Sequence, residues 1–181
     1  RQVGESLDAI VARQGKELSV KIPLKAPSDL VAGPRYDVKP SYLIVGGLVF
    51  MPLTDDLIAA RGGDYRVRSL SADGAPTPER TQVVVLSHVL AHDFNRGYHS
   101  WSMAPVTQVN GLKIGQLADL VDAFKTPVKG RHEIELSNYS GYGENKGTRI
   151  VLDASDAAKV MPEIMHRYGV PSDQSGDLKA R

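Results

Sequence analysis

Apolar and polar residues alternate in several short runs along the chain, and this period of two is typical of strands with one buried face. The first two runs flank the turn signal Gln14-Gly15 and predict a hairpin over residues 7–24. A third run, SYLIVGGLVF over 41–50, is interrupted by Gly46-Gly47 and predicts a strand that is bent or bulged at the glycines. A fourth, QVVVLSHVL over 82–90, is the most apolar and predicts a central strand.

Shorter runs later in the chain predict three further strands. They lie at 106–109, 133–136 and 149–152, and Asn110-Gly111 after the first of them is a strong turn signal. The last two flank a loop over 138–147 that is rich in Gly, Tyr and Asn, so they predict a second hairpin.

A period near 3.6 predicts helices in three places. Thr54 can cap a short helix over 55–61 that ends before Gly62. Residues 114–124 place apolar side chains at helical spacing, and a third helical pattern follows Asp153. Few helices therefore separate the strands.

The last helical pattern contains a proline. Ser155 can cap this helix and Gly169 can end it, while Pro162 is expected to kink it or to start a second helix. The polar residues 170–181 that follow predict a tail lying extended on the surface.

This order of elements favours a mainly β, α+β fold: an antiparallel barrel or sandwich with two or three helices. Three prolines and a glycine mark residues 27–40 as a linker and as the best domain boundary. We therefore expect a hairpin unit over 1–26, a main domain over 41–153, and a helical extension with its tail over 154–181. Because a two-stranded hairpin is marginal alone, the first unit must pack on something.

The composition removes several classes of function. The chain has 181 residues and a formal net charge of +1, so no global field draws it to nucleic acid or to an acidic membrane. It has no cysteine, which excludes disulfides and thiolate sites. No apolar run approaches the roughly 18–20 residues of a membrane span. The sequence starts without Met and without a signal-peptide core, and we expect a piece of a longer protein.

Catalytic and metal-binding patterns are weak. His88, His92 and Asp93, with His99 and His132, are the tempting cluster, but no HExxH glutamate is present, and four strand positions span about 13 Å. No GxSxG, GxGxxG or GxxxxGK[ST] motif occurs. We expect no catalytic residue, no metal site and no cofactor.

A peptide groove is the more productive hypothesis. Paired glycines can turn backbone N–H groups outward, where they can hold a carboxylate. The amphipathic helix over 114–124 and a strand over 48–52 would then flank an extended peptide added as a strand. Core packing of the helix and a packing bulge at the glycines are the plainer interpretation of the same residues.

Four stretches, in order, resemble the second, C-terminal PDZ-like domain of HtrA/Deg-type serine proteases of plants and bacteria. They are PSYLIVGGLVFMPLT (40–54), QVVVLSHVLAHDFNRGY (82–98), VTQVNGLKI (106–114) and MPEIMHRYGVPSDQSGDL (161–178). VGESLDAIVARQGKELSVKIPL resembles the closing hairpin of the PDZ domain before it. The likeness covers about residues 40–178.

The resemblance implies a circularly permuted PDZ-like fold in a module that is not itself an enzyme. A trypsin-like protease domain would lie upstream, since its triad and GNSGG loop have no match here. Implied partners are a peptide or unfolded segment, or a PDZ domain of the same or a sister subunit in a homo-oligomer. Bacterial relatives imply the periplasm, plant relatives organelles or the nucleus. The implied binding residues are Gly46, Gly47, Leu48, Val49 and Phe50 at the carboxylate end and Leu117, Leu120, Val121 and Phe124 on the helix wall.

The sequence also departs from the family. GGLVF stands where ordinary PDZ loops have GLGF, and Val49 replaces the second glycine of that pattern; HDFNRGYHSW replaces a PGSPA-type loop. These changes suggest adaptation to contacts within the protease assembly. The alternative function is therefore a structural oligomerisation domain whose groove is filled by residues 161–178 or by Phe50. A third is a hydrolase built around His88, His92 and Asp93.

Overall fold

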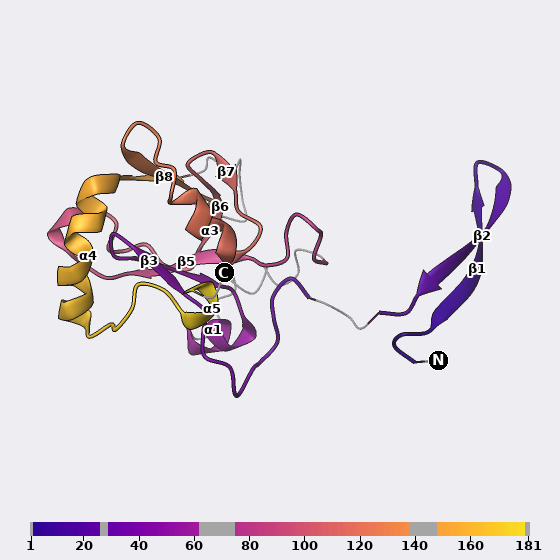
Figure 1. The fold of residues 1–181 in the computed structure, drawn as a ribbon. Helices are drawn as coiled ribbons and strands as arrows, with labels where there is room; N and C mark the ends of the chain where they lie inside the picture. The colour runs from indigo at the N-terminus through magenta and orange to yellow at the C-terminus, as the bar shows by residue number, and fades with distance from the viewer. Residues whose placement is uncertain (1, 26–28, 62–74, 138–147, 180–181) are drawn as a thin grey trace.

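The computed structural model describes residues 2–25, 29–61, 75–137 and 148–179. Its main body is an antiparallel sheet with strand order β3-β4-β5-β6-β8-β9, and β7 pairs with β6 (Figure 1). The mainly β, α+β fold expected from the sequence is confirmed. The strands of this sheet are β3 (Leu43–Val45), β4 (Leu48–Pro52), β5 (Val84–Val89), β6 (Ala104–Val109), β7 (Leu112–Lys113), β8 (Arg131–Leu136) and β9 (Thr148–Asp153).

Short helices lie between the strands, and a long one follows the last strand. They are α1 (Asp55–Ala60), the 3-10 turn η1 (Asp93–Asn95), α3 (Leu117–Ala123), α4 (Ala154–Tyr168) and α5 (Gly176–Lys179). Thr54 caps α1 as predicted, because its hydroxyl accepts a hydrogen bond from the Leu57 N–H. Gly62 and the loop over 138–147 lie outside the described residues.

Gly46-Gly47 joins two separate strands, so the prediction of one bent strand was wrong. Val45 pairs with Leu48 across a two-residue turn, and both glycines have positive φ (56° and 87°). This is the geometry of a tight hairpin turn, which glycine enters without steric cost. A bulge is present as well, but it lies between Val49 and Phe50, where β4 shifts register against β5.

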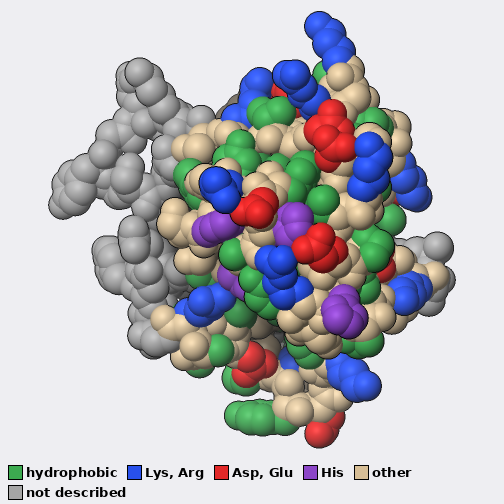
Figure 2. Space-filling view, turned by 90° about the vertical axis from the view of Figure 1, so that its left-hand side faces the viewer, with side chains coloured by type: hydrophobic (Ala, Val, Ile, Leu, Met, Phe, Trp, Pro, Cys, Tyr) green, Lys and Arg blue, Asp and Glu red, His purple; other side chains and the backbone are tan. Residues whose placement is uncertain are grey.

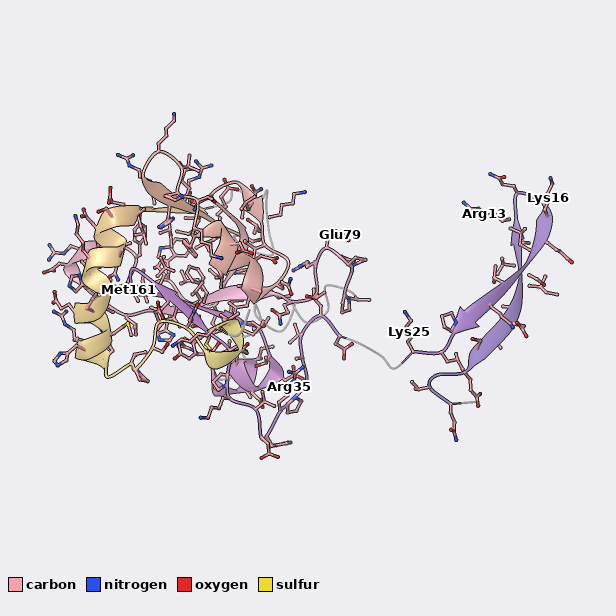
Figure 3. The ribbon with its side chains drawn as sticks, viewed as in Figure 1. Arg13, Lys16, Lys25, Arg35, Glu79 and Met161 are labelled. Carbon is pink, nitrogen blue, oxygen red and sulfur yellow. The ribbon has the colours of Figure 1, made fainter. Side chains whose placement is uncertain are left out.

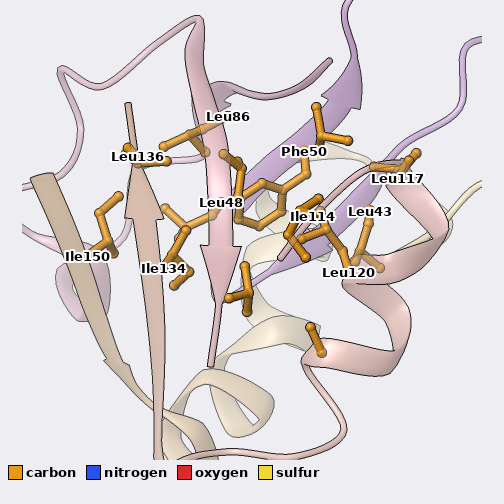
Figure 4. Close-up of a cluster of buried hydrophobic side chains, with 14 of the residues drawn as sticks. Leu43, Leu48, Phe50, Leu86, Ile114, Leu117, Leu120, Ile134, Leu136 and Ile150 are labelled. Carbon is orange, nitrogen blue, oxygen red and sulfur yellow. The ribbon is translucent and has the colours of Figure 1, made fainter. Parts of the chain in front are cut away.

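The core lies between the sheet and α3. Phe50, Leu48 and Leu86 from the central strands, Ile134 from β8 and Leu120 from α3 are fully buried in one cluster (Figure 4). A second cluster packs α4 on the other side, where Ile164 is enclosed with side chains of the β3–β4 hairpin. The β3–β4 hairpin therefore contributes to both clusters.

Two expectations about the flanking segments need correction. Leu30 and Val31, in the predicted linker, are buried in a cluster with Leu53 after β4, Ile58 of α1 and Val85 of β5, and Ala32 bridges to Thr54. Helix α4 runs on through Pro162 and is capped by Asp153 instead of Ser155. The proline lies on the exposed side of α4, as does Ala158 four residues before it, so water can bond the carbonyl that loses its partner.

The exposed side of α4 carries both charge signs. Lys159 pairs with Asp156, and Arg167 pairs with Glu163. Positive and negative side chains are interspersed over this face of the molecule (Figure 2). Such a surface is typical of a solvated helix face. No helix in the described part of the chain combines the length and apolar character needed to cross a bilayer.

The first hairpin, β1 (Ser6–Arg13) and β2 (Lys16–Pro23), matches the prediction, with its turn at Gln14-Gly15. The turn that joins β1 and β2, flanked by Arg13 and Lys16, lies away from the main sheet (Figures 1 and 3). None of the three clusters of buried side chains includes a hairpin residue. The register puts one apolar set on a single face: Leu7, Ala9, Val11, Leu18, Val20 and Ile22.

Because the hairpin adds nothing to these clusters, its removal should leave the main body stable. We expect a chain that begins at Asp29 to unfold within about 2 °C of the full chain in a calorimetric scan. A chain that begins at Arg35 also loses Leu30 and Val31, and its midpoint should fall by more than about 5 °C. Equal losses in the two truncations would contradict this division.

Candidate functional site

The free edge of the sheet next to α3 is β3. Strand β4 pairs with β3 on one side and with β5 on the other. A strand with two partners has no edge left for a peptide. The predicted groove between helix 114–124 and strand 48–52 is therefore wrong in its strand, and β3 takes that position.

The C-terminal segment already pairs with this edge. The Ile44 N–H donates to the Asp173 carbonyl (N···O 2.7 Å), and the Ser175 N–H donates to the Tyr42 carbonyl (3.0 Å). Leu43 and Gln174 form an antiparallel bridge between these two bonds. Residues 172–178, called the tail segment below, thus pair with this edge around Gln174 and then enter α5 at Gly176, where the sequence predicted an extended surface tail.

Side chains fasten the tail segment at both ends. The Tyr42 N–H donates to Ser175 Oγ (3.0 Å), and the Tyr42 hydroxyl donates to the Ser172 carbonyl (3.2 Å). Further along, the Ser41 hydroxyl donates to Asp177 Oδ2 (2.8 Å). Hydrogen bonds from Ser175, Ser41 and the backbone hold the pKa of Asp177 below its ordinary value. The carboxylate form of Asp177 therefore suits this position.

Leu178 anchors the tail segment in the core. Its side chain is only 6% exposed, and it belongs to the cluster that contains Leu43 of β3 and Leu117 and Leu120 of α3. Burial of a leucine side chain contributes about 2 kcal/mol. A buried aliphatic side chain from the tail thus completes the contact between β3 and the helix beside it.

The Gly46-Gly47 turn is enclosed by the loop after β5. Asn95, 0% exposed, donates through Nδ2 to the Gly46 and Leu90 carbonyls, both at 2.9 Å. The Leu90 N–H donates to the Gly47 carbonyl (2.8 Å). A Cβ on Gly47 would collide with Asn95 Nδ2 and lie 2.7 Å from the Leu90 carbonyl oxygen. The two glycines are therefore held inside the protein.

The other predicted binding residues lie in or against the core. Leu48, Val49, Phe50, Leu117 and Leu120 are buried, while Val121 and Phe124 are partly buried and pack on the same cluster. The Phe124 ring lies 5.6 Å from the Phe50 ring, centroid to centroid. The structure thus brings both predicted sets together. Their role in peptide binding stays a prediction.

The candidate hydrolase residues point to separate partners. His88 Nδ1 contacts Ser87 Oγ at 3.0 Å, and Asp93 pairs with Arg96. His92 Nδ1 accepts the Phe94 N–H, and its Nε2 faces Glu163 at 3.2 Å. Both ring nitrogens of His92 are therefore engaged in holding η1 and α4. Across the described residues, no group of three His, Asp or Glu side chains is placed to hold a metal ion.

Asn110 and His132 join the end of α3 to β8. Asn110 Nδ2 donates to the Ala123 carbonyl (2.8 Å) and lies 3.2 Å from His132 Nδ1. The His132 ring stands edge-on to Phe124, with centroids 5.0 Å apart. Burial lowers the pKa of His132, while Asp153 acts in the opposite direction. The fold therefore favours the neutral imidazole, which can accept the Asn110 hydrogen bond.

The profile of the PDZ domain family matches residues 31–177. The chain belongs to the PDZ domain family. The match begins after the first hairpin and includes the tail segment to Asp177. It thus covers the sheet, α3 and the edge pairing described above.

Plant proteases contain the same region. The chain is 34% identical to the "Putative protease Do-like 3, mitochondrial" of Arabidopsis thaliana over 172 residues, which is 94% of this chain and 28% of that protein. It is 32% identical to "Protease Do-like 2, chloroplastic" of the same plant, over 97% of this chain and 28% of the relative. This PDZ domain is therefore related to Deg/HtrA-type proteases, and the chain spans less than a third of these two relatives.

The alternative interpretation, a groove filled by residues 161–178, named the segment that occupies this edge, but it did not single out the residues that pair there. They are Tyr42 just before β3, Ile44 in β3, and Asp173, Ser175 and Leu178 in the tail segment. The segment reads SDQSGDL, so a single apolar residue stands among polar ones. Period analysis gives such a stretch no strand signal.

The enclosure of the glycine turn can be tested with two glycines of similar φ. Gly47 (φ 87°) touches Asn95 and Leu90, whereas a Cβ on Gly97 (φ 97°) meets nothing within 4 Å. We expect Gly97→Ala to cost about 1 kcal/mol from backbone strain alone, and Gly47→Ala at least about 3 kcal/mol because a collision adds to the strain. Urea unfolding measures both; equal costs would contradict the enclosed turn.

The state of His132 gives a pH prediction. Because its pKa is lowered in the fold, the unfolded chain binds a proton first as the pH falls below about 6.5. The stability from neutral His132 is present above that pH and is lost on acidification through the lowered pKa of the folded state. Burial also lowers the pKa of His88, so His88 and His132 both contribute to the loss of folding stability at low pH. His132→Gln should reduce the loss between pH 7.5 and 5.5.

The unmodified chain is the reference for this prediction. If the slope of unfolding free energy against pH between pH 7.5 and 5.5 is the same in His132→Gln as in the unmodified chain, His132 does not carry the effect.

Proposed function

We propose that this chain is a non-catalytic regulatory module of a Deg/HtrA-type serine protease, and that it holds one extended segment on β3 beside α3. The observation that carries the proposal is the antiparallel pairing of the tail segment with Tyr42–Ile44. Strand addition at a sheet edge is a general mode of peptide recognition, in which backbone bonds give affinity and pockets give side-chain preference. Here the tail segment of the same chain makes the backbone bonds, and its Leu178 fills the apolar space beside α3.

A non-catalytic role agrees with the side chains available. Ser87, the serine beside a histidine, is 1% exposed and donates to the Val49 carbonyl, so it cannot reach a substrate. The named relatives are called proteases, and this chain covers only their PDZ region. Cleavage would be the task of another part of such a protein.

The first hairpin fits a place in a longer chain. Its apolar face, Leu7 to Ile22 across both strands, has no cover among the clusters of buried side chains. Isolated hairpins are marginal in water. The proposal therefore includes the hairpin as the closing part of a preceding PDZ domain, which makes the described domain the second of its protein.

The test weakens the binding of the tail segment by a substitution and adds a peptide of the same sequence that can take its place. Leu178→Ala removes most of the buried anchor, with Lys179→Ala, which is exposed, as the matched control. We expect a fluorescein-labelled peptide VPSDQSGDLKA to bind Leu178→Ala at least tenfold more tightly than the unmodified chain or Lys179→Ala, because the edge is free more often. Fluorescence anisotropy gives the affinities.

The structural alternative predicts a different result. If the tail segment is a permanent part of the core, no variant binds the peptide, and the Leu178→Ala chain merely unfolds at a lower urea concentration. Light scattering on the unmodified chain would then decide whether its role is oligomerisation.

A further inference from the structure

The direction in which the tail segment runs along β3 indicates what kind of ligand this edge can bind. Along the tail, Asp173 bonds Ile44, Ser175 bonds Tyr42, and Asp177 bonds Ser41. Residue numbers therefore increase along the tail segment while those of its partners decrease from Ile44 to Ser41, so the two segments run antiparallel. A bound chain therefore runs away from Gly46-Gly47, and its carboxyl end leaves at Ser41.

The glycine turn is thus at the wrong end to hold a terminal carboxylate. Its two carbonyls are bonded by Asn95 and the Leu90 N–H, and both glycines are buried. At the other end, the outward N–H of Tyr42 is bonded by a side-chain hydroxyl, Ser175 Oγ. No terminal carboxylate is needed to complete these bonds.

Besides the backbone bonds, the site binds three side chains of the tail segment. Ser175 bonds Tyr42, Asp177 accepts from the Ser41 hydroxyl, and Leu178 enters the cluster with Leu43 and α3. A ligand that ended at the position of Ser175 would leave the seat of Leu178 empty. That loss removes about as much buried apolar surface as a leucine provides.

We infer that the β3 edge recognises a chain-internal segment of the pattern Ser-x-Asp-Leu, and that it does not require a free C-terminus. This inference rests on the proposed function. It names the ligand class: a stretch inside a polypeptide that pairs along the edge and then makes a helical turn, with a hydroxyl residue opposite Tyr42 and an aliphatic residue three positions later in that turn. The tail segment is the example of this class that occupies the site in cis.

The experiment uses two forms of the full chain with a loosened tail. One is Leu178→Ala. In the other, a site-specific protease cuts a recognition sequence inserted between Val170 and Pro171 after the chain has folded, so the result does not depend on the folding of a core variant. Four labelled peptides are titrated by anisotropy: VPSDQSGDLKA as acid, the same as amide, its Leu→Ala version, and VPSDQS with a free carboxylate.

The inference predicts that the acid and amide of the long peptide bind within about twofold of each other. It predicts at least tenfold weaker binding for the Leu→Ala peptide and for VPSDQS, because both lack the buried leucine. Strong binding of VPSDQS, or loss of binding on amidation, would overturn the inference and leave the strand-accepting function in place. Binding of none of the four would overturn both.

Discussion

The unpaired edge of β3 is the constraint on which the rest of the domain depends. Strands β4, β5, β6 and β8 each have partners on both sides, whereas β3 presents backbone groups that must be bonded by another segment or by water. The tail segment meets this need with two backbone bonds, and Leu178 closes the space between β3 and α3. An edge that would otherwise invite aggregation becomes an occupied site.

That occupation relies on a rigid β3. The strand has only three residues, and it is held in place by the hairpin turn at Gly46-Gly47, which Asn95 fixes from the loop after β5. His92 connects the same loop to Glu163 of α4, and α4 leads directly into the tail segment. The turn, the loop, the helix and the tail thus form one continuous support for the edge. This arrangement accounts for polar side chains in the loop after β5, because Asn95 bonds the glycine turn and His92 faces α4.

Much of the fold could be predicted from local patterns. The first hairpin, β5 as a central strand, the Asn110-Gly111 turn, the Thr54 cap and the end of α4 at Gly169 all follow from turn chemistry or periodicity, which act over a few residues. The errors came from contacts between distant segments. Two glycines are compatible with a bulge or with a hairpin, and only the packing of Asn95 and Leu90 around them selects the hairpin. Likewise, SDQSGDL has no strand propensity; its first residues pair with the sheet because the edge at β3 offers unpaired backbone groups.

The cross-strand hydrogen bonds between β3 and the tail segment can be measured directly in solution. Scalar couplings across N–H···O=C bonds in an isotope-labelled sample of the full chain report each donor and acceptor pair. We predict couplings from the Ile44 amide to the Asp173 carbonyl and from the Ser175 amide to the Tyr42 carbonyl, with slow hydrogen exchange at both amides. Absence of both couplings, together with rapid exchange of the Ile44 and Ser175 amides, would show an open edge and contradict the central claim.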